Sequence, residues 1–299
     1  MAVFEQVVIL FTFVAMGYII SKFGKVNAQH SKVLSSVLVD VILPFNVLKA
    51  FWGSFTVQYL SENLFMVMVS VAVLLTLSVA AYFCGKLFDK NPYIRKVYEY
   101  SLVIPNMGYM GYPLAEAMYG AAGLMDLMMF GIPVSLYIYI YGYPILTKTK
   151  ISLKKLLNPV IITMVIAMAL GLSGLQMPTL VADILGKGSA CMGPISMLLT
   201  GIVISEYNLK AILGDGKIFI MSALRLVVIP ILIGLVLSPF VEKEIVRTAV
   251  LLYALPCGLN TVVFPKLVGE NCRIGAGLAL VSHLAACATI PFVFWIFQL

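Results

Sequence analysis

Long apolar runs, separated by short stretches that carry charge or Gly and Pro, fill almost the whole chain of 299 residues. A helix needs about 20 consecutive apolar residues to cross a bilayer. The pattern therefore predicts ten membrane-spanning helices, and Pro178–Gly186 either forms an interfacial helix or begins the seventh. The predicted spans are Val3–Lys22, Ser31–Trp52, Leu64–Leu87, Val97–Tyr119, Leu124–Leu146, Leu156–Leu172, Ser189–Glu206, Ile218–Phe240, Val246–Leu267 and Ile274–Phe297.

Two of these runs contain breaks. Ser101–Gly120 is apolar but carries two prolines, several glycines and a central Asn106, and Leu255–Leu267 has the same character. A break in a spanning helix frees backbone groups that lipid cannot satisfy, so it persists only where protein or a wet cavity surrounds it. The pair therefore marks a candidate binding site.

The composition agrees with a membrane protein, since 62% of residues are hydrophobic, 11% are charged and the mean hydropathy is +1.04. Soluble domains carry about 25% charged residues. The net charge of +7 lies in the loops and does not indicate nucleic-acid binding. One side of the predicted topology holds 15 Lys and Arg and the other 4, which places both termini outside a cell membrane. The five widely spaced Cys indicate neither a metal site nor a disulfide framework.

The two halves of the chain repeat. Pro44 and Pro105 are 61 residues apart, and Pro194 and Pro256 are 62 apart. Residues 1–150 and 151–299 are thus predicted to form two five-helix repeats of one transporter domain. Because each repeat has an odd number of spans, the second enters the membrane from the opposite side, as in many secondary transporters.

Four segments together span nearly the whole chain, namely Val33–Leu48, Asn106–Gly120, Gly193–Ser205 and Leu255–Asn271. They resemble the auxin efflux carrier family. Bacterial members of that family are associated with malate, malonate and other small carboxylates. The resemblance implies a fold similar to bile acid/sodium symporters, in which the fourth and ninth of ten helices are broken and cross. Pro265 and Cys257 depart from the small residue and the Ser that are common in the family.

The predicted substrate site lies at this crossing, where half-helix N-termini suit a carboxylate. The Asn side chains either bind substrate or satisfy freed backbone groups, and the Gly residues either admit ligand or pack helices. Arg225 either attracts an anion, pairs with an acid or reaches the interface. The candidates are Pro105, Asn106, Gly108, Gly111, Pro256, Gly258, Asn260 and Arg225.

Coupling to protons or sodium is predicted at Asp40, Asn46 and Ser196. Asp40, near the middle of the second span, is expected to be the best-buried acid, either a coupling site or an internal partner. Asn46 and Ser196 follow the matched prolines by two residues and either line the cavity or join helices. His283, in the tenth span, is more typical of a hydrogen-bonded packing residue.

These features favour a secondary transporter of a small carboxylate that works by alternating access. One bundle would carry the first, second, sixth and seventh spans. The alternatives are a sodium-coupled symporter of a larger, bile-acid-like anion and a transporter-derived sensor. Neither HExxH nor GxxxxGK[ST] occurs, so an enzyme or an ATP-driven pump is not indicated. No cofactor is expected, and the expected partners are substrate, lipid and a second copy in a homodimer.

Overall fold

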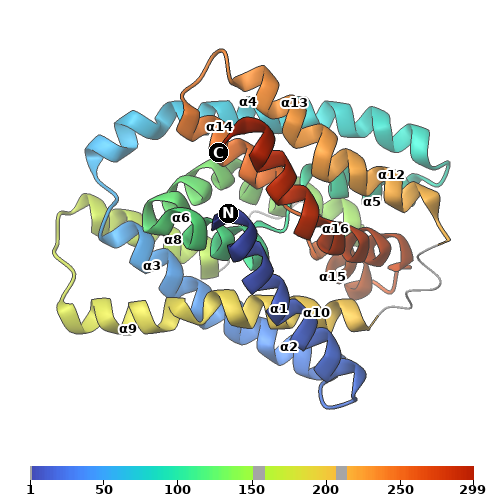
Figure 1. Cartoon of the computed structure of the whole chain (residues 1–299), viewed down its shortest axis with the longest axis horizontal. Coiled ribbons are helices and arrows are strands. Elements are labelled where there is room, and N and C mark those ends of the chain that lie inside the picture. Colours follow the sequence, from blue (N-terminus) through green and yellow to red (C-terminus); the bar gives the residue numbers. More distant parts are fainter. Residues whose placement is uncertain (1, 151–158, 207–213) are drawn as a thin grey trace. The chain divides into compact units, whose positions relative to one another are not determined.

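The computed structural model describes residues 2–150, 159–206 and 214–299 (Figure 1). In these residues, regular structure is helical apart from one isolated bridge between Pro105 and Cys257. The helices form two compact units, each built from distant parts of the chain. Unit 1 comprises Met1–Phe65, Gly108–Met129 and Lys154–Glu206, and unit 2 comprises Met66–Met107, Phe130–Leu153 and Tyr207–Leu299.

Seven helical stretches of the described residues are long and apolar enough to cross a membrane, which confirms the all-helical membrane class. A further apolar helix, α8 (Pro159–Leu172), is shorter, and the start of its predicted span lies outside the described residues. Large apolar side chains such as Leu87 and Trp295 are exposed, as expected of surfaces that face lipid. The seven stretches are Glu5–Lys22, His30–Trp52, Val57–Phe88, Met107–Thr147, Thr179–Ser205, Gly216–Leu237 and Arg273–Phe297. Thr179–Ser205 is one such stretch, so the segment after Pro178 is continuous with the residues of the predicted seventh span.

Unit 1 is a bundle in which α1 packs along α10, and α3 packs against α8 and α9. Glycines permit the packing of α1 along α10, because a Cβ on Gly17 would lie 2.1 Å from the carbonyl oxygen of Leu198. Small residues at such crossings let helix backbones approach closely. Unit 1 contains the four spans that the sequence assigns to one bundle, together with Gly108–Met129. Its helices are α1 (Ala2–Lys22), α2 (Ala28–Val37), α3 (Leu43–Trp52), α8, α9 (Thr179–Ala190), α10 (Met192–Ser205) and the first part of α6 (Tyr112–Tyr137).

Unit 2 is organised around α16, which packs against α5, α12, α14 and α15. The first helix of this group, α5, begins at Asn91, whose side chain accepts the backbone N–H groups of Tyr93 and Ile94. Pro92 follows, at a position where no N–H is needed. The helices of unit 2 are the larger part of α4 (Val57–Phe88), α5 (Pro92–Val103), the end of α6, α7 (Tyr143–Thr147), α12 (Gly216–Ala223), α13 (Ile229–Leu237), α14 (Lys243–Ala254), α15 (Asn260–Leu267) and α16 (Arg273–Phe297).

Asp89 connects the α4–α5 loop to the start of α12. Its carboxylate accepts the Asn91 backbone N–H at 2.8 Å and lies 3.5 Å from the Lys217 ammonium. The Asn91 hydrogen bond is the main reason why the pKa of Asp89 falls below its ordinary value of 3.8, and the charge of Lys217 adds to the effect. Asp89 itself lies between the apolar stretches, and both contacts favour the ionised acid.

In the described part of the chain, short π-helical turns widen four helices, and each turn ends two residues before a proline. A proline ring clashes with the carbonyl four residues earlier and lacks an N–H, and a π turn changes the local hydrogen-bonding register. One of these turns carries Asp40 and another carries Arg225. The four turns are η1 (Leu38–Ile42), η2 (Met107–Gly111), η3 (Ile138–Gly142) and η5 (Leu224–Val228).

Four glycines among the described residues adopt positive φ, where residues with a Cβ are strained. Gly120 interrupts α6, with φ 68° and ψ −160°, so this long helix changes course within its length. The others lie in connections after helices. All four are Gly24, Gly120, Gly174 and Gly269.

Candidate functional site

The two predicted breaks pair with each other inside unit 2. Both arise before a proline, because the residue preceding proline is pushed out of the helical region. Ile104 has φ −98° and ψ 114°, and Leu255 has φ −64° and ψ 149°. The Asn106 N–H donates to the Pro256 carbonyl at 2.8 Å, and the Gly258 N–H donates to the Ile104 carbonyl at 3.0 Å. The extended residues thus form a short antiparallel contact between the ends of α5 and α14.

This pairing shows how the breaks survive within an apolar protein. The N–H groups that each break frees are largely used by the other break. The Cys257 N–H is also satisfied, since it donates to the Ser282 hydroxyl on α16 at 3.2 Å. Buried backbone groups are almost always paired in this way. An anion at the paired breaks would therefore need donors other than these N–H groups.

Arg225 lies fully inside unit 2, with 1% of its surface exposed, so the interpretation that it reaches the interface is wrong. Its guanidinium donates to the carbonyl of Leu102, in the last turn of α5, and at 3.2 Å to that of Leu255, directly after α14. Helix C-termini carry unpaired carbonyls and partial negative charge. One cation therefore satisfies the C-terminal ends of both interrupted helices.

The charge of Arg225 has no carboxylate partner among the described residues, where the ion pairs involve other side chains. Its Nη2 atom is buried and makes no hydrogen bond. The Tyr253 ring lies 5.5 Å from the guanidinium carbon and provides a cation–π contact. The interior of unit 2 thus retains a net positive charge beside the paired breaks.

Asn106 is joined to His283 of α16, 177 positions later in the chain, by a hydrogen bond of 2.8 Å. The other ring nitrogen of His283 lies 2.6 Å from the Ala279 carbonyl oxygen. A carbonyl only accepts, so Nδ1 of His283 carries the proton, and Nε2 accepts from the Asn106 amide. One interpretation proposed that the Asn106 side chain satisfies freed backbone groups. The structure shows that its amide instead bonds His283. It bonds a neutral, fully buried imidazole.

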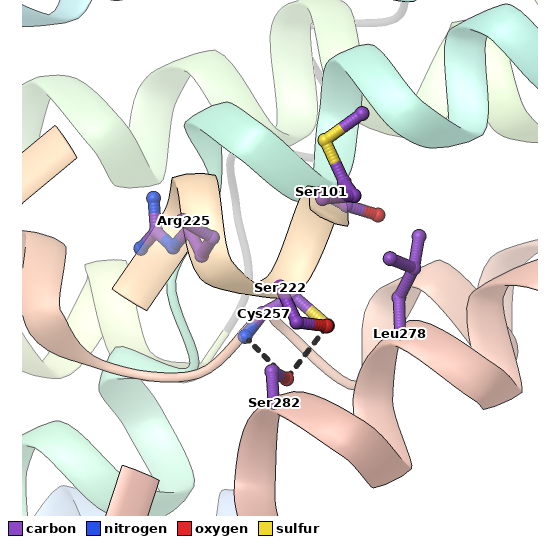
Figure 2. Close-up of a pocket in the computed structure, with 7 residues that line it drawn as sticks. Ser101, Ser222, Arg225, Cys257, Leu278 and Ser282 are labelled. Carbon is purple, nitrogen blue, oxygen red and sulfur yellow. Dashed lines mark hydrogen bonds between the residues drawn. The ribbon is translucent and has the colours of Figure 1, made fainter. Parts of the chain in front are cut away.

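A small polar pocket lies next to Arg225 (Figure 2). Serines from α5, α12 and α16 meet the Cys257 thiol there, and Figure 2 shows Ser282 bonded to the nitrogen and sulfur of Cys257. The Ser222 hydroxyl is buried without a partner. The gap between the side chains is too tight for a water molecule, so the structure shows the pocket closed. Its lining is Ser101, Met221, Ser222, Arg225, Cys257, Leu278 and Ser282.

Asn260 opens α15 and is half-buried. Its side chain approaches the hydroxyl of the buried Tyr100 on α5, but the two do not complete a hydrogen bond. The N-terminal end of a helix carries partial positive charge, which suits an anion. Asn260 and Tyr100 are therefore the polar side chains near the start of α15 that remain available to a ligand.

The predicted glycines differ in their surroundings. A Cβ on Gly258 would lie 3.3 Å from the Pro105 carbonyl oxygen, so Gly258 allows the two breaks to approach each other. A Cβ on Gly108, in unit 1, would meet open space. Gly111 is buried and ends the η2 turn, also in unit 1. Unit 2 thus brings together six of the eight predicted substrate residues, namely Pro105, Asn106, Pro256, Gly258, Asn260 and Arg225.

The expectation that Asp40 is the best-buried acid is wrong, because Asp40 is exposed. The buried face of its helix carries Leu38, Ile42 and Asn46, at intervals of four residues, and Asp40 falls on the opposite face. Among the described acids, Asp126 on α6 is the most buried, at 9% exposure, and it accepts the Tyr59 hydroxyl at 2.7 Å.

Asn46 and Ser196 are fully buried, but no hydrogen bond joins them to each other or to Asp40 in the described structure. Ser196 donates to the Gly193 carbonyl of its own helix at 3.1 Å. Asn46 instead donates from Nδ2 to Glu116 of α6 at 2.9 Å. The three predicted coupling residues therefore do not form one cluster.

Sequence reasoning missed several polar contacts of both units. Ser282 and His283 give a signal, because they form an adjacent polar pair within the apolar tenth span. Glu116 also stands out as an acid within an apolar run. Tyr100 and Ser222 give none, since isolated Tyr and Ser are common in membrane helices. Of the described residues, no group of three or more His, Cys, Asp or Glu could hold a metal ion.

Paired proline breaks within an apolar helical protein define the class of this chain as a multi-pass membrane protein. The family model described as "Membrane transport protein" matches residues 2–151 and 144–296. The chain is also similar to a protein of Methanocaldococcus jannaschii named "Uncharacterized transporter MJ1031", with 23% identity over 98% of each chain. The chain belongs to the membrane transport protein family, the auxin efflux carrier family, as its sequence predicts.

Proposed function

We propose that this chain is a secondary active transporter that moves a small organic carboxylate across the cell membrane by alternating access. The observation that carries the proposal is the meeting of two proline breaks beside a buried Arg225 without a carboxylate partner. Broken helices are typical of transporter binding sites, and a buried charge within a membrane protein usually serves function. A fixed positive charge there favours an anionic substrate.

The contacts that we propose for the substrate carboxylate are centred on the start of α15. The N–H groups of Asn106 and Gly258 already bond the opposite break. The Asn260 amide and the Tyr100 hydroxyl are the remaining donors, and the α15 dipole adds positive potential. Arg225 then acts at longer range, as the charge that stabilises both interrupted helices and attracts the anion.

The proposal includes ten membrane helices in two inverted repeats, with both termini outside the cell. The backbone supports this repeat, because glycines with positive φ and the prolines of the predicted repeat recur about half a chain apart. Gly120 would divide the stretch Met107–Thr147 into parts of the fourth and fifth helices. The recurring pairs and their spacings are Gly24 and Gly174 (150), Pro44 and Pro194 (150), Pro105 and Pro256 (151), and Gly120 and Gly269 (149).

Uptake by proteoliposomes tests the function directly. The purified protein is reconstituted and loaded with unlabelled malate, malonate or an auxin-like acid, and exchange for the labelled acid is measured. Exchange of at least one of these acids is expected. Asn260→Ala removes an amide donor and should weaken apparent affinity roughly tenfold, the effect of about 1.4 kcal/mol. Gln58→Ala, an exposed amide in unit 1 that bonds Glu62, is the matched control and should leave exchange unchanged.

Three results would contradict the proposal. If no carboxylate exchanges under a proton, sodium or voltage gradient, the chain is not an anion transporter of this kind. Exchange of a bile-acid-like anion alone, and only with sodium, would favour the sodium-coupled alternative. Normal exchange by Asn260→Ala would move the substrate site away from α15.

A further inference from the structure

A polar cluster of three side chains lies in unit 1, whereas the paired breaks belong to unit 2. Asn46 and Lys49 stand one turn apart on α3. Both reach Glu116 on α6, and each contacts a different carboxylate oxygen. Asn46 Nδ2 donates to Oε2 at 2.9 Å, and Lys49 Nζ lies 2.9 Å from Oε1. The carboxylate is thus held by one neutral donor and one cation.

The cluster is incomplete on one side. Asn46 is fully buried, and its Oδ1 atom has no hydrogen-bond partner. A buried acceptor left without a donor costs about 1–3 kcal/mol. An ionised Glu116 cannot satisfy Oδ1, because a carboxylate only accepts hydrogen bonds. A protonated Glu116 can, since its O–H becomes a donor to Oδ1 once the Asn46 amide turns, and Nδ2 then takes the place of Oδ1 as the unpaired atom.

These contacts define two states that differ by one proton. With Glu116 ionised, Asn46 donates to it and Lys49 pairs with it. With Glu116 protonated, the acid donates to Asn46 and the negative charge that holds Lys49 is gone. The Lys49 side chain is 38% exposed, so water can then solvate its ammonium.

We propose that Glu116 is the proton-binding residue that couples carboxylate transport to proton movement. The inference rests on the proposed transport of a carboxylate. Protonation of Glu116 removes one negative charge from the cluster, and the substrate carboxylate brings one negative charge to the protein. One proton and one anionic charge therefore enter the cycle together, and the protein keeps its net charge.

Other charged groups of unit 1 do not compete for this role. Asp40 is exposed and lies on the opposite face of its helix from Asn46. Asp126 accepts the Tyr59 hydroxyl. The helix α9, which packs against α3, carries an exposed Asp183 and an exposed Lys187, and neither bonds Glu116 in the described structure. Lys49 is thus the one described cation in an ion pair with Glu116.

The test uses proteoliposomes that contain the full chain and labelled malonate or malate. A pH gradient is imposed, and the accumulation of label is compared with its exchange at equal pH. For one proton per substrate, and with the membrane potential clamped at zero, accumulation by the unmodified protein should rise about tenfold per pH unit. Glu116→Gln mimics the protonated acid and should keep exchange but lose accumulation. Lys49→Met removes the cation that favours the ionised acid and should also keep exchange but weaken accumulation, whereas Asp40→Asn should keep both.

A second measurement does not depend on transport. Infrared difference spectra of the purified protein should show the C=O band of a protonated carboxylic acid on acidification, and Glu116→Gln should lack it. If the variant keeps this band, or keeps gradient-driven accumulation, the inference is overturned. It is also overturned if Asp40→Asn alone loses the gradient response. Failure of every carboxylate to exchange, with the band still dependent on Glu116, would instead refute the proposed substrate class.

Discussion

Arg225→Met tests whether one cation holds the two interrupted helices together. The substitution keeps an unbranched side chain but removes the donors to the carbonyls of Leu102 and Leu255. Each buried carbonyl that loses its donor lowers the free energy of unfolding by about 1–3 kcal/mol, so the two together lower it by about 2–6 kcal/mol. The substitution also removes a buried charge that lacks a carboxylate partner, which restores part of this stability. The expected loss therefore lies towards the lower end of the range.

Arg225→Lys separates the charge from the geometry of the side chain. Two different guanidinium nitrogens bond the two carbonyls, whereas Lys has a single nitrogen. One carbonyl should therefore lose its donor, at a cost of about 1–3 kcal/mol. The order of stability is expected to be Arg, then Lys, then Met.

Thermal unfolding in detergent measures this order. At about 2–4 °C per kcal/mol, the Met variant should lose roughly 4–24 °C of its midpoint. Lys217→Met is the control, because it removes a half-exposed cation from α12 and should cost less than about 1 kcal/mol. An unchanged midpoint for Arg225→Met would show that Arg225 does not hold the break ends. Lost exchange with normal stability would assign Arg225 to substrate contact alone.

Three further predictions concern the crossing and one loop. Gly258→Ala should reduce stability and exchange, because its new methyl group would lie 3.3 Å from the Pro105 carbonyl oxygen of the opposite break. Gly108→Ala should be tolerated in thermal unfolding and exchange assays, because a Cβ there has open space. A double-mutant cycle of Asn106→Ala and His283→Ala should give a coupling energy of about 1 kcal/mol, and purely additive losses would contradict their hydrogen bond. Asp89→Asn should lower the free energy of unfolding at pH 7 by no more than about 1 kcal/mol, because Asp89 is partly exposed, and the thermal midpoint should fall slightly. Folding lowers the pKa of Asp89, so the stability that Asp89 contributes is complete above pH 3.8 and is lost as the pH falls through its folded-state pKa. If the unmodified protein and Asp89→Asn differed in midpoint as much at about pH 2 as at pH 7, this account would be refuted.

The paired breaks show how far local sequence signals reach. Pro105 and Pro256 each force the preceding residue out of the helix, so the position of each break follows from two or three neighbouring residues. Their partnership was predicted from matched spacing and family resemblance. The hydrogen bonds that join them are a property of the folded chain, because they link residues about 150 positions apart.

The acids within apolar runs show where prediction from the sequence failed. Asp40 and Glu116 are both acids within apolar runs, and neither pattern reveals which side chain faces protein. In a soluble helix, polar residues mark the outer face, but in a membrane both the lipid-facing and the packed faces are apolar. The burial of Asn46 and the exposure of Asp40 therefore required the contacts of α3 with its neighbours.

By itself, the sequence determined that this is a helical membrane transporter of a known family, and it located both breaks, because hydrophobic length and proline geometry act locally. Only the tertiary structure decided which groups meet at the site. Arg225 bonds two helix ends, and Asn106 bonds His283, because folding brings these distant residues together. A buried polar group must find a partner, and the partner depends on how the helices pack rather than on the neighbouring sequence.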